Sequence, residues 1–240
     1  MFGSRCLLAS GHRAARVFVA VLLAGLIAAL GTAEVRASGP ALQARGHGAQ
    51  SAATRYVYLT FDDGPDPRYT QQVLDVLRAF GVRATFFELG SNVSRYPGLT
   101  ARVHRRGHSV QNHTWSHPDL RHVSWTRFRH EVLATDRQIR ARTGYTPRCL
   151  RPPYGAVNAL VYDRAARLRK KIRLWTVDPR DWSRPGVSVI VHRVLNNVVG
   201  GSVVLFHDGG GDRSQTVAAL PTILRALKAR GYHFAQLWCR

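Results

Sequence analysis

The stretch YVYLTFDDGP, residues 56–65, shows the pattern from which the chain is built. Residues 56–61 are β-branched, aromatic or otherwise apolar, a composition typical of a β-strand. This run ends in an acidic pair, Asp62 and Asp63, and the Gly-Pro that follows is typical of a turn. The stretch therefore predicts a strand that delivers polar side chains at its carboxyl end.

Short apolar runs of this kind alternate with amphipathic stretches from residue 56 onward. Predicted strands are 56–61, 84–89, 108–112, 149–151, 172–177, 202–206 and 233–237. Predicted helices are 70–80, 99–106, 125–143, 160–170, 187–199 and 216–230. Alternating strands and helices favour a parallel α/β domain, and about seven such units favour a closed or nearly closed (β/α) barrel over an open sheet.

Polar side chains follow most of the predicted strands. In chain order they are Asp62 and Asp63, His113, Arg151, Asp178 and Asp181, and His207 and Asp208. Because the carboxyl ends of barrel strands carry the chemistry in barrel enzymes, these groups are expected to meet at one mouth. Asp178 and Asp208 are interpreted as structural residues of their loops.

The run HTWSH, residues 113–117, places two histidines four positions apart. At that spacing His113 and His117 would share one face of a helical turn and could hold one ion. Two histidines and one carboxylate with open positions are typical of a catalytic divalent metal such as zinc. Two structural interpretations stay open at this point: DDGP is a good turn sequence, and a pair of histidines can arise by chance in a chain with 11 of them.

Five short motifs occur in a fixed order along the chain. They are TFDDGP (60–65), HTWSH (113–117), RPPY (151–154), DPRDW (178–182) and LFHD (205–208). Together they resemble the motifs of the polysaccharide deacetylases, the NodB-homology carbohydrate esterases of family 4. The resemblance covers residues 55–240 and implies a distorted, complete or incomplete, (β/α) barrel of about seven strands. It also implies a metal-dependent hydrolase that acts on acetylated sugars.

The resemblance implies a role for each motif residue on the metal side of the site. Asp63, His113 and His117 match the metal ligands. Asp62 matches the general base and Arg151 the residue that orients it. A carboxylate between a cation and an arginine is expected to be ionised and able to accept a proton.

The remaining motif residues match the acid and the acetyl pocket. His207 corresponds to the general acid and Asp181 to the carboxylate that supports it, which would favour the imidazolium form. Trp182 and Leu205 would line the pocket for the acetyl methyl group. Tyr154 matches a position whose backbone N–H helps to stabilise the oxyanion.

The predicted function is the removal of N-acetyl groups from N-acetylglucosamine polymers, with peptidoglycan as the first substrate and chitin oligomers as the second. Two alternatives stay open. The same site in this family can cleave O-acetyl esters of xylan, and the domain could be a non-catalytic basic module that binds cell-wall glycans. A pure binding module has no need of an acid, a base and a metal together, which favours the enzyme.

Residues 1–37 are interpreted as an export signal. Arg5, Arg13 and Arg16 precede an apolar run, 17–31, which is shorter than the ~20 residues of a membrane span. Small residues before Ser38 suggest cleavage there and a protein that is secreted or held in the cell wall without a membrane span; an uncleaved anchor is the alternative. Residues 38–54 are interpreted as a flexible linker and 55–240 as the catalytic domain.

Charge and cysteines narrow the class of partners. The formal net charge of +21 favours anionic cell-wall polymers, although a solvated basic surface would explain much of it. Scattered arginines without an interleaved aromatic motif argue against nucleic acid. Loss of the signal would leave Cys149 and Cys239, which form either a disulfide or two buried free thiols.

Overall fold

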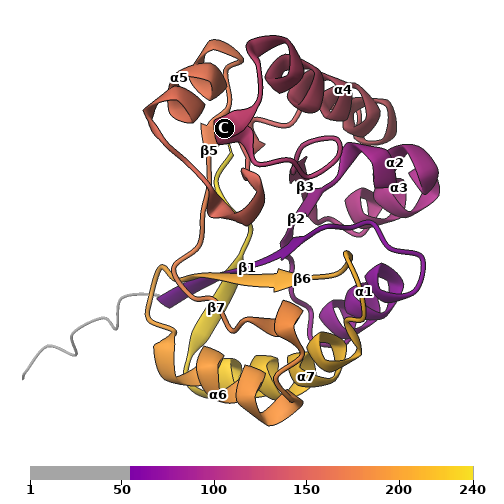
Figure 1. Cartoon of the computed structure of the whole chain (residues 1–240). Coiled ribbons are helices and arrows are strands. Elements are labelled where there is room, and N and C mark those ends of the chain that lie inside the picture. Colours follow the sequence, from indigo (N-terminus) through magenta and orange to yellow (C-terminus); the bar gives the residue numbers. More distant parts are fainter. Residues whose placement is uncertain (1–54, 240) are drawn as a thin grey trace, which may run out of the picture. The chain divides into compact units, whose positions relative to one another are not determined.

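The computed structural model describes residues 55–239, which form one parallel sheet flanked by helices (Figure 1). The strands are β1 (Arg55–Asp62), β2 (Thr85–Glu88), β3 (Ser109–Asn112), β4 (Cys149–Leu150), β5 (Lys171–Ile172), β6 (Val203–His207) and β7 (Tyr232–Ala235). The α-helices are α1 (Tyr69–Ala79), α2 (Gly90–Arg95), α3 (Pro97–Arg105), α4 (Trp125–Thr143), α5 (Ala159–Arg167), α6 (Val187–Asn197) and α7 (Ser214–Ala229). Three short 3-10 helices are η1 (Leu120–His122), η2 (Pro153–Gly155) and η3 (Asp181–Ser183).

The strand order β5-β4-β3-β2-β1-β6, with β7 also paired to β1, makes a curved sheet in which every pairing is parallel. The segment after β5 returns to the other edge, where Val177 forms a single bridge with Val204 of β6. The sheet is therefore an incomplete barrel, and the predicted fold class is confirmed. The carboxyl ends of its strands share one rim.

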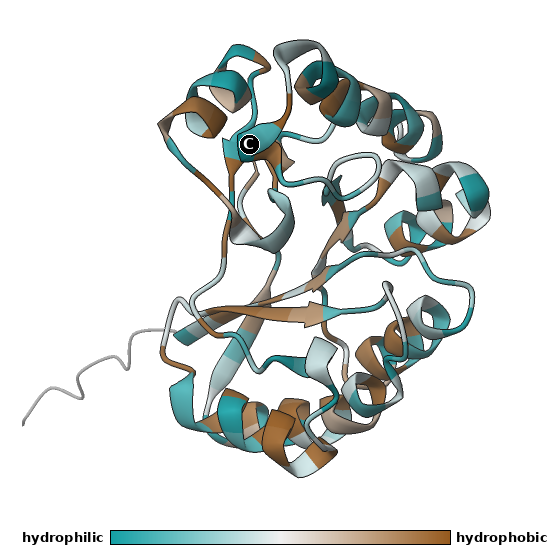
Figure 2. Ribbon diagram, in the orientation of Figure 1, coloured by the Kyte–Doolittle hydropathy of each residue, from teal (hydrophilic) through white to brown (hydrophobic). Residues whose placement is uncertain are grey.

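The core lies between β1 and the helices that cover it. Figure 2 shows that the apolar faces of these helices turn toward the sheet. Phe61 of β1 stacks between Phe86 and Phe206, with ring centroids 5.0 and 5.6 Å away. Burying an aromatic side chain of this kind stabilises a fold by about 1.5–3 kcal/mol, so this stack fixes the three strands that carry much of the site.

The predicted strand 172–177 is wrong beyond its first residue, because β5 ends at Ile172. The side chain of Arg151 donates hydrogen bonds to the two backbone carbonyl groups that a longer β5 would use for strand pairing. Its Nε donates to the Arg173 oxygen at 2.9 Å and its Nη2 to the Leu174 oxygen at 3.1 Å. The chain then turns to β6, where the Thr176 N–H donates to Val203. Beyond Ile172 this segment therefore contributes a single bridge, at Val177, to the sheet.

The predicted export signal and linker lie outside the described residues. Between residues 55 and 239, no helix is both long and apolar enough to cross a membrane. The two cysteines of the domain form a disulfide between β4 and the segment after β7, with Cα atoms 5.4 Å apart. Of the two interpretations of Cys149 and Cys239, the disulfide is therefore the correct one.

Candidate active site

The acidic pair at the end of β1 sends its two carboxylates in different directions. The register of β1 and β6 places Asp62 beside His207, on the inner face of the sheet. Asp63 takes a left-handed backbone conformation with φ of 71°, and its side chain lies against the two histidines of the loop after β3. A Cβ on Gly210 would lie 2.6 Å from Asp63 Oδ2, so only glycine fits above this carboxylate. One strand end thus supplies two separate acids.

The segment 113–117 is not the helical turn that the spacing of its histidines suggested. Thr114 and His117 have φ angles of 72° and 62°, and the segment forms an irregular loop after β3. The predicted proximity is nevertheless confirmed by this different backbone. The Nε2 atoms of His113 and His117 each lie 3.4 Å from Asp63 Oδ1.

These three side chains fit a divalent cation. Each offers one ligand atom, and the three atoms lie within 4.8 Å of one another. His113 Nδ1 lies 2.7 Å from the Arg151 carbonyl oxygen, so it is the protonated nitrogen and leaves the Nε2 lone pair free. Asp63 Oδ1 is buried without a hydrogen-bond partner. Lone pairs that face each other in this way are stabilised by a cation between them.

The groups around the candidate metal site shift the pKa values of its three residues in different directions. Burial lowers the pKa of His113, but the charge of Asp62 and the contact with Asp63 outweigh it and raise that pKa. By contrast, the pKa values of Asp63 and His117 are shifted toward the deprotonated forms. Burial works against ionisation of Asp63, but the close approach of His113 Nε2 and the charges of the histidines lower its pKa below the ordinary value. Burial, together with the neighbouring His113, lowers the pKa of His117. A neutral imidazole and an ionised carboxylate are the forms that bind a metal.

Arg151 is fully buried and holds Asp62 from behind. Its Nη1 donates to Asp62 Oδ1 at 2.7 Å and to Thr60 Oγ1 at 2.8 Å. Its guanidinium carbon lies 4.0 Å from the centre of the Phe87 ring. The other carboxylate oxygen, Asp62 Oδ2, lies 3.8 Å from His113 Nε2 and faces the candidate metal site. Asp62 therefore has one oxygen fixed and one available to accept a proton.

His207 and Asp181 form a second buried pair. His207 Nδ1 lies 2.7 Å from Asp181 Oδ1, while the His207 backbone N–H and the Thr216 hydroxyl both donate to Asp181 Oδ2. Burial lowers the pKa of His207, but the hydrogen bond and charge of Asp181 outweigh it and raise the pKa to about 9. The imidazolium form can release a proton from Nε2, which is what a general acid requires.

The three residues predicted to bind the acetyl group lie in two environments. Tyr154 and Trp182 are exposed, and the Tyr154 ring packs edge-on against His117 with centroids 4.6 Å apart. Leu205 is buried and pairs in register with Thr60, two residues before His207 on the same face of β6. Tyr154 also has a positive φ of 60°, which sets the direction of its peptide groups.

Two further acids near the site were given no catalytic role by the sequence. Asp208 is fully buried, with its Oδ2 accepting a hydrogen bond from Thr70 at 2.5 Å, and burial raises its pKa to about 7. Burial likewise raises the pKa of Glu88 to about 8. A Cβ on Gly64 would lie 2.6 Å from both carboxylate oxygens of Asp208. Asp208 therefore packs directly beneath the DDGP turn, in agreement with its structural interpretation.

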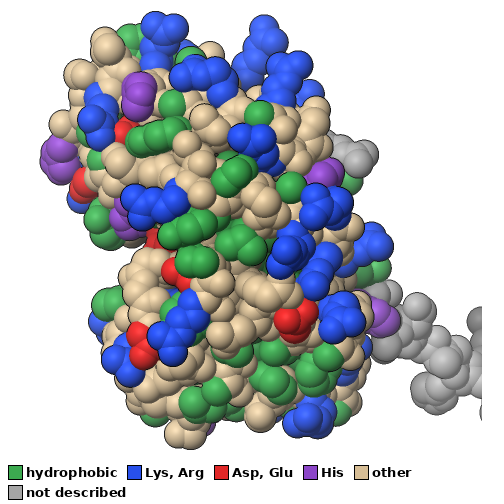
Figure 3. All heavy atoms as spheres, turned by 90° about the vertical axis from the view of Figure 1, so that its right-hand side faces the viewer, with side chains coloured by type: hydrophobic (Ala, Val, Ile, Leu, Met, Phe, Trp, Pro, Cys, Tyr) green, Lys and Arg blue, Asp and Glu red, His purple; other side chains and the backbone are tan. Residues whose placement is uncertain are grey.

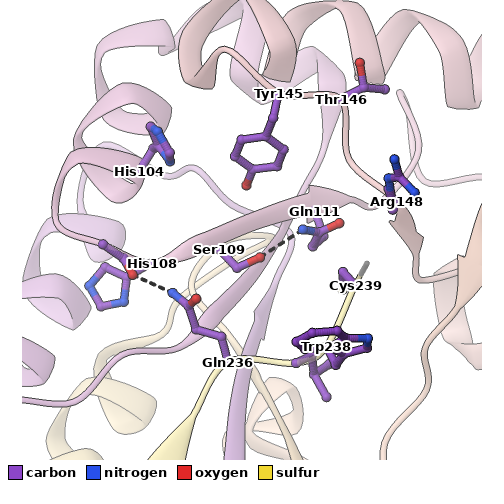
Figure 4. A pocket seen from close by; sticks show the side chains of 12 residues that line it. His104, His108, Ser109, Gln111, Tyr145, Thr146, Arg148, Gln236, Trp238 and Cys239 are labelled. Carbon is purple, nitrogen blue, oxygen red and sulfur yellow. Dashed lines mark hydrogen bonds between the residues drawn. The ribbon is translucent and has the colours of Figure 1, made fainter.

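A pocket of about 820 Å³ lies at the opposite end of the sheet, where β3 and β4 begin (Figure 4). The segment after β7 forms one wall. Gln236 donates to the Gly107 oxygen, the Leu237 N–H donates to Thr85, and Cys239 closes the wall through its disulfide. This wall is fixed by three separate contacts.

Most polar groups in this pocket are bonded to the protein itself. The Tyr145 hydroxyl exchanges hydrogen bonds of 2.7 Å with both the N–H and the oxygen of Val110. The Gln111 amide donates to Ser109 and accepts from the Cys149 N–H, each at 2.9 Å. None of the catalytic or ligand residues predicted from the sequence lines this pocket. The candidate chemistry belongs to the other rim.

Comparisons with known proteins find that the chain is similar to polysaccharide deacetylases. A family model described as polysaccharide deacetylase matches residues 49–172. A peptidoglycan-N-acetylglucosamine deacetylase of Bacillus cereus is 43% identical over 182 residues, which cover 75% of this chain and 85% of the relative. A chitooligosaccharide deacetylase of Bradyrhizobium sp. is 43% identical over 198 residues, which cover 78% of this chain and 90% of the relative.

Comparison with solved structures also finds a deacetylase. The crystal structure of a peptidoglycan N-acetylglucosamine deacetylase superposes with a TM-score of 0.75 and 37% sequence identity. The superposition covers 77% of this chain and 87% of that structure. At this level of identity the likeness extends beyond the fold to the sequence.

Proposed function

Because this chain belongs to the polysaccharide deacetylase family, we propose that it hydrolyses N-acetyl groups of N-acetylglucosamine-containing glycans to a free amine and acetate. The observation that carries the proposal is the meeting of two acid–base pairs and three ligand atoms on one rim. Asp62, held by Arg151, and His207, held by Asp181, lie side by side where β1 and β6 end. Such a set serves hydrolysis, since binding alone needs neither pair.

When bound, a divalent metal, for which we propose zinc, polarises the acetyl carbonyl and lowers the pKa of water. Asp63, His113 and His117 would hold it. Asp62 Oδ2 accepts a proton from the attacking water, while Arg151 keeps the other oxygen in place. This division of tasks explains why two adjacent acids are turned apart.

The second half of the reaction uses His207. The water oxygen bonds to the acetyl carbon, and the carbon–nitrogen bond then breaks with its electron pair going to nitrogen. That nitrogen takes the proton from His207 Nε2 and leaves as an amine. The bond from Nδ1 to Asp181 keeps the ring oriented during the transfer. Acetate is the other product.

We propose that three residues position the acetyl group of the substrate. Leu205 lines the methyl position from the inner face of β6, and Trp182 covers it from η3. The Tyr154 N–H would donate to the developing oxyanion, supported by the positive φ of this residue. These roles rest on the resemblance of the motifs and on the positions of the three residues around the rim.

Peptidoglycan is the proposed substrate, with chitin oligomers second. The face in Figure 3 carries Lys and Arg side chains spread across it with few acidic groups between them. A field of this sign attracts anionic wall polymers, which would be the neighbours of an exported enzyme. Export through residues 1–37, and a secreted or wall-bound location, form part of this proposal.

The test is acetate release by the purified domain, residues 55–240, from peptidoglycan, N-acetylglucosamine oligomers and acetylated xylan. Each substrate is incubated with zinc and, in parallel, with a chelator. We expect chelator-sensitive release from the amide substrates, strongest with peptidoglycan. Release from xylan alone would make the protein an O-acetyl esterase. No release from any substrate by the zinc-bound protein would favour a glycan-binding module.

A further inference from the structure

The backbone N–H groups of the ligand loop, residues 113–117, are all bonded inward. The His113 N–H donates to the Glu88 oxygen, and the His117 N–H donates to the Thr114 hydroxyl at 3.1 Å. Three N–H groups lie between the ligands, and that of Thr114 donates to Asn112 Oδ1 at 2.8 Å. Those of Trp115 and Ser116 both donate to Oε2 of Glu131, each at 2.8 Å. Each of the five amides is therefore satisfied within the protein, as buried backbone groups require.

Glu131 lies on α4, and its side chain is fully buried. Besides the two N–H groups it accepts a bond from the Ser116 hydroxyl at 2.9 Å, through Oε1. Arg127, one turn earlier on the helix, donates to the same Oε1 at 2.7 Å and also reaches the Ser116 hydroxyl. Both carboxylate oxygens of Glu131 thus accept hydrogen bonds from the ligand loop, and Oε1 also accepts one from Arg127, whose charge neutralises Glu131.

The loop needs an external support because its own conformation is unfavourable. Thr114 and His117 both have left-handed backbones, which cost non-glycine residues about 1–2 kcal/mol each. Neither a helix nor a strand ladder stabilises residues 113–117. Charge-assisted bonds to a buried carboxylate are among the stronger hydrogen bonds available to a backbone. Glu131 therefore supplies what the local sequence does not.

The other side of the loop is also fixed to rigid elements. The carbonyl groups of Thr114 and Trp115 accept bonds from the first N–H groups of α2, on Gly90 and Ser91. A Cβ on Gly90 would lie 2.4 Å from Thr135 of α4 and 2.6 Å from the Trp115 ring. The loop is thus bonded to α4 through its N–H groups and to α2 through its carbonyl groups.

We propose that Glu131 is a positioning residue that presets the His113–His117 loop for metal before any metal binds. The inference rests on the proposed metal site at Asp63, His113 and His117. Glu131 itself touches neither a ligand atom nor the reacting groups, and it acts through the backbone of Trp115 and Ser116. Its effect should therefore appear in metal affinity and geometry without any substrate present.

The experiment compares zinc binding by the wild-type domain and by two variants, Glu131→Ala and Glu131→Gln, in competition with a chromophoric chelator. Outer partners of metal ligands typically contribute about 10- to 100-fold in affinity, so we expect a loss of that size for the alanine variant. The glutamine variant keeps one acceptor oxygen and should lose less. Cobalt-loaded samples report the geometry, because the visible spectrum of cobalt changes with its ligand set.

Ile139→Ala is the matched control, since Ile139 lies on the same helix, is fully buried and contacts the core instead of the loop. It should lower the unfolding temperature and leave zinc affinity and the cobalt spectrum unchanged. If zinc affinity falls equally in the control, Glu131 acts only through the stability of α4, and the inference is wrong. Wild-type affinity and spectrum in Glu131→Ala would overturn it as well.

A measurement on the wild-type protein covers the case in which Glu131→Ala does not fold. Hydrogen exchange in the metal-free protein should find the Trp115 and Ser116 amides protected. Fast exchange that becomes slow only after zinc is added would show that the metal shapes the loop, and would overturn the inference. Because no substrate is used, a protein that binds zinc but releases no acetate would refute the deacetylase proposal without changing this result.

Discussion

The two ends of the half-barrel treat their buried polar groups in opposite ways. Within residues 55–239, three buried side-chain oxygen or nitrogen atoms have no hydrogen-bond partner, and all three lie at the rim that carries the motifs. They are Asp63 Oδ1, Glu88 Oε1 and Asp208 Oδ1. At the other end, the polar groups of the pocket, such as Tyr145 and Gln111, bond to neighbouring residues. A disulfide closes that end.

Backbone strain follows the same division. Seven non-glycine residues of the described chain have positive φ angles, and five of these lie within the motifs, namely Asp63, Thr114, His117, Tyr154 and Arg180. An unpartnered buried polar group costs about 1–3 kcal/mol and a strained residue a similar amount. The comparison shows that this molecule concentrates its unfavourable local terms where chemistry is proposed and builds the far end for stability.

The largest effect is expected from a change at the ligands. His117→Ala removes one of three ligand atoms, so zinc binding and acetate release should be lost together, by more than the 10- to 100-fold typical of outer partners. Equilibrium dialysis with zinc and an acetate assay measure the two losses. An active variant without bound metal would show that this rim is not the metal site.

Asp62→Asn should separate the base from the ligands. Replacing the carboxylate removes the proton acceptor but leaves Asp63, His113 and His117 in place, so turnover should fall about 10²- to 10⁴-fold with zinc still bound. The measurement is kcat beside the zinc content of the same sample. Loss of the zinc would mean that Asp62, and not Asp63, is the ligand.

Asp181→Asn tests the raised pKa of His207. Asp181 favours the charged imidazole, so this stabilisation is complete below the ordinary pKa and is lost as the pH rises through about 9. Without Asp181 the alkaline limb of kcat/KM should move to lower pH, and a return toward an ordinary histidine pKa of about 6.5 lowers activity at pH 8 about 30-fold. A pH–rate profile with an unchanged alkaline limb would contradict the role of His207 as acid.

The smallest effect on activity is expected at the opposite end. Replacing Cys149 and Cys239 together by alanine removes a crosslink between residues 90 positions apart, so the free energy of unfolding should fall by about 2–4 kcal/mol. Because the rim is built by other contacts, kcat/KM at 25 °C should stay within about twofold. Denaturant unfolding and steady-state kinetics provide the two numbers. A large loss of activity with unchanged stability would contradict the assignment of catalysis to one end of the half-barrel and stability to the other.

Much of the fold could be predicted because its pattern is local. The helix predicted at 125–143 has those bounds in the structure, and seven strands occur near their predicted positions. The side chains at strand ends meet because parallel strands share one rim, and that rule needs only the order of the motifs. Asp62, Asp63, His113, Arg151, Asp181 and His207 all lie there.

What the sequence missed depends on contacts between distant residues. The loop after β3 looked helical from its histidine spacing, but its backbone is dictated by Glu131, which lies 16 positions beyond Trp115. Strand β5 is cut short by Arg151, 22 positions before the carbonyl that it captures. Helix α2 was not predicted, because its six residues, GSNVSR, carry no apolar period. The only signal for Glu131 was an acid in a helix rich in arginine, and Asp136 on the same helix shares that signal.

The central position of β1 has a consequence for how the protein folds. This strand is the first of the domain, yet it pairs with β6 through Tyr58 and Val203 and with β7 through Arg55 and Tyr232. Contacts of such high sequence separation give a high contact order, and domains of this kind fold slowly. Asp62 and His207 come together only when this pairing forms, so deacetylase activity during refolding should return with the last strands and not before them. The recovery of activity during refolding should therefore report when the sheet is complete.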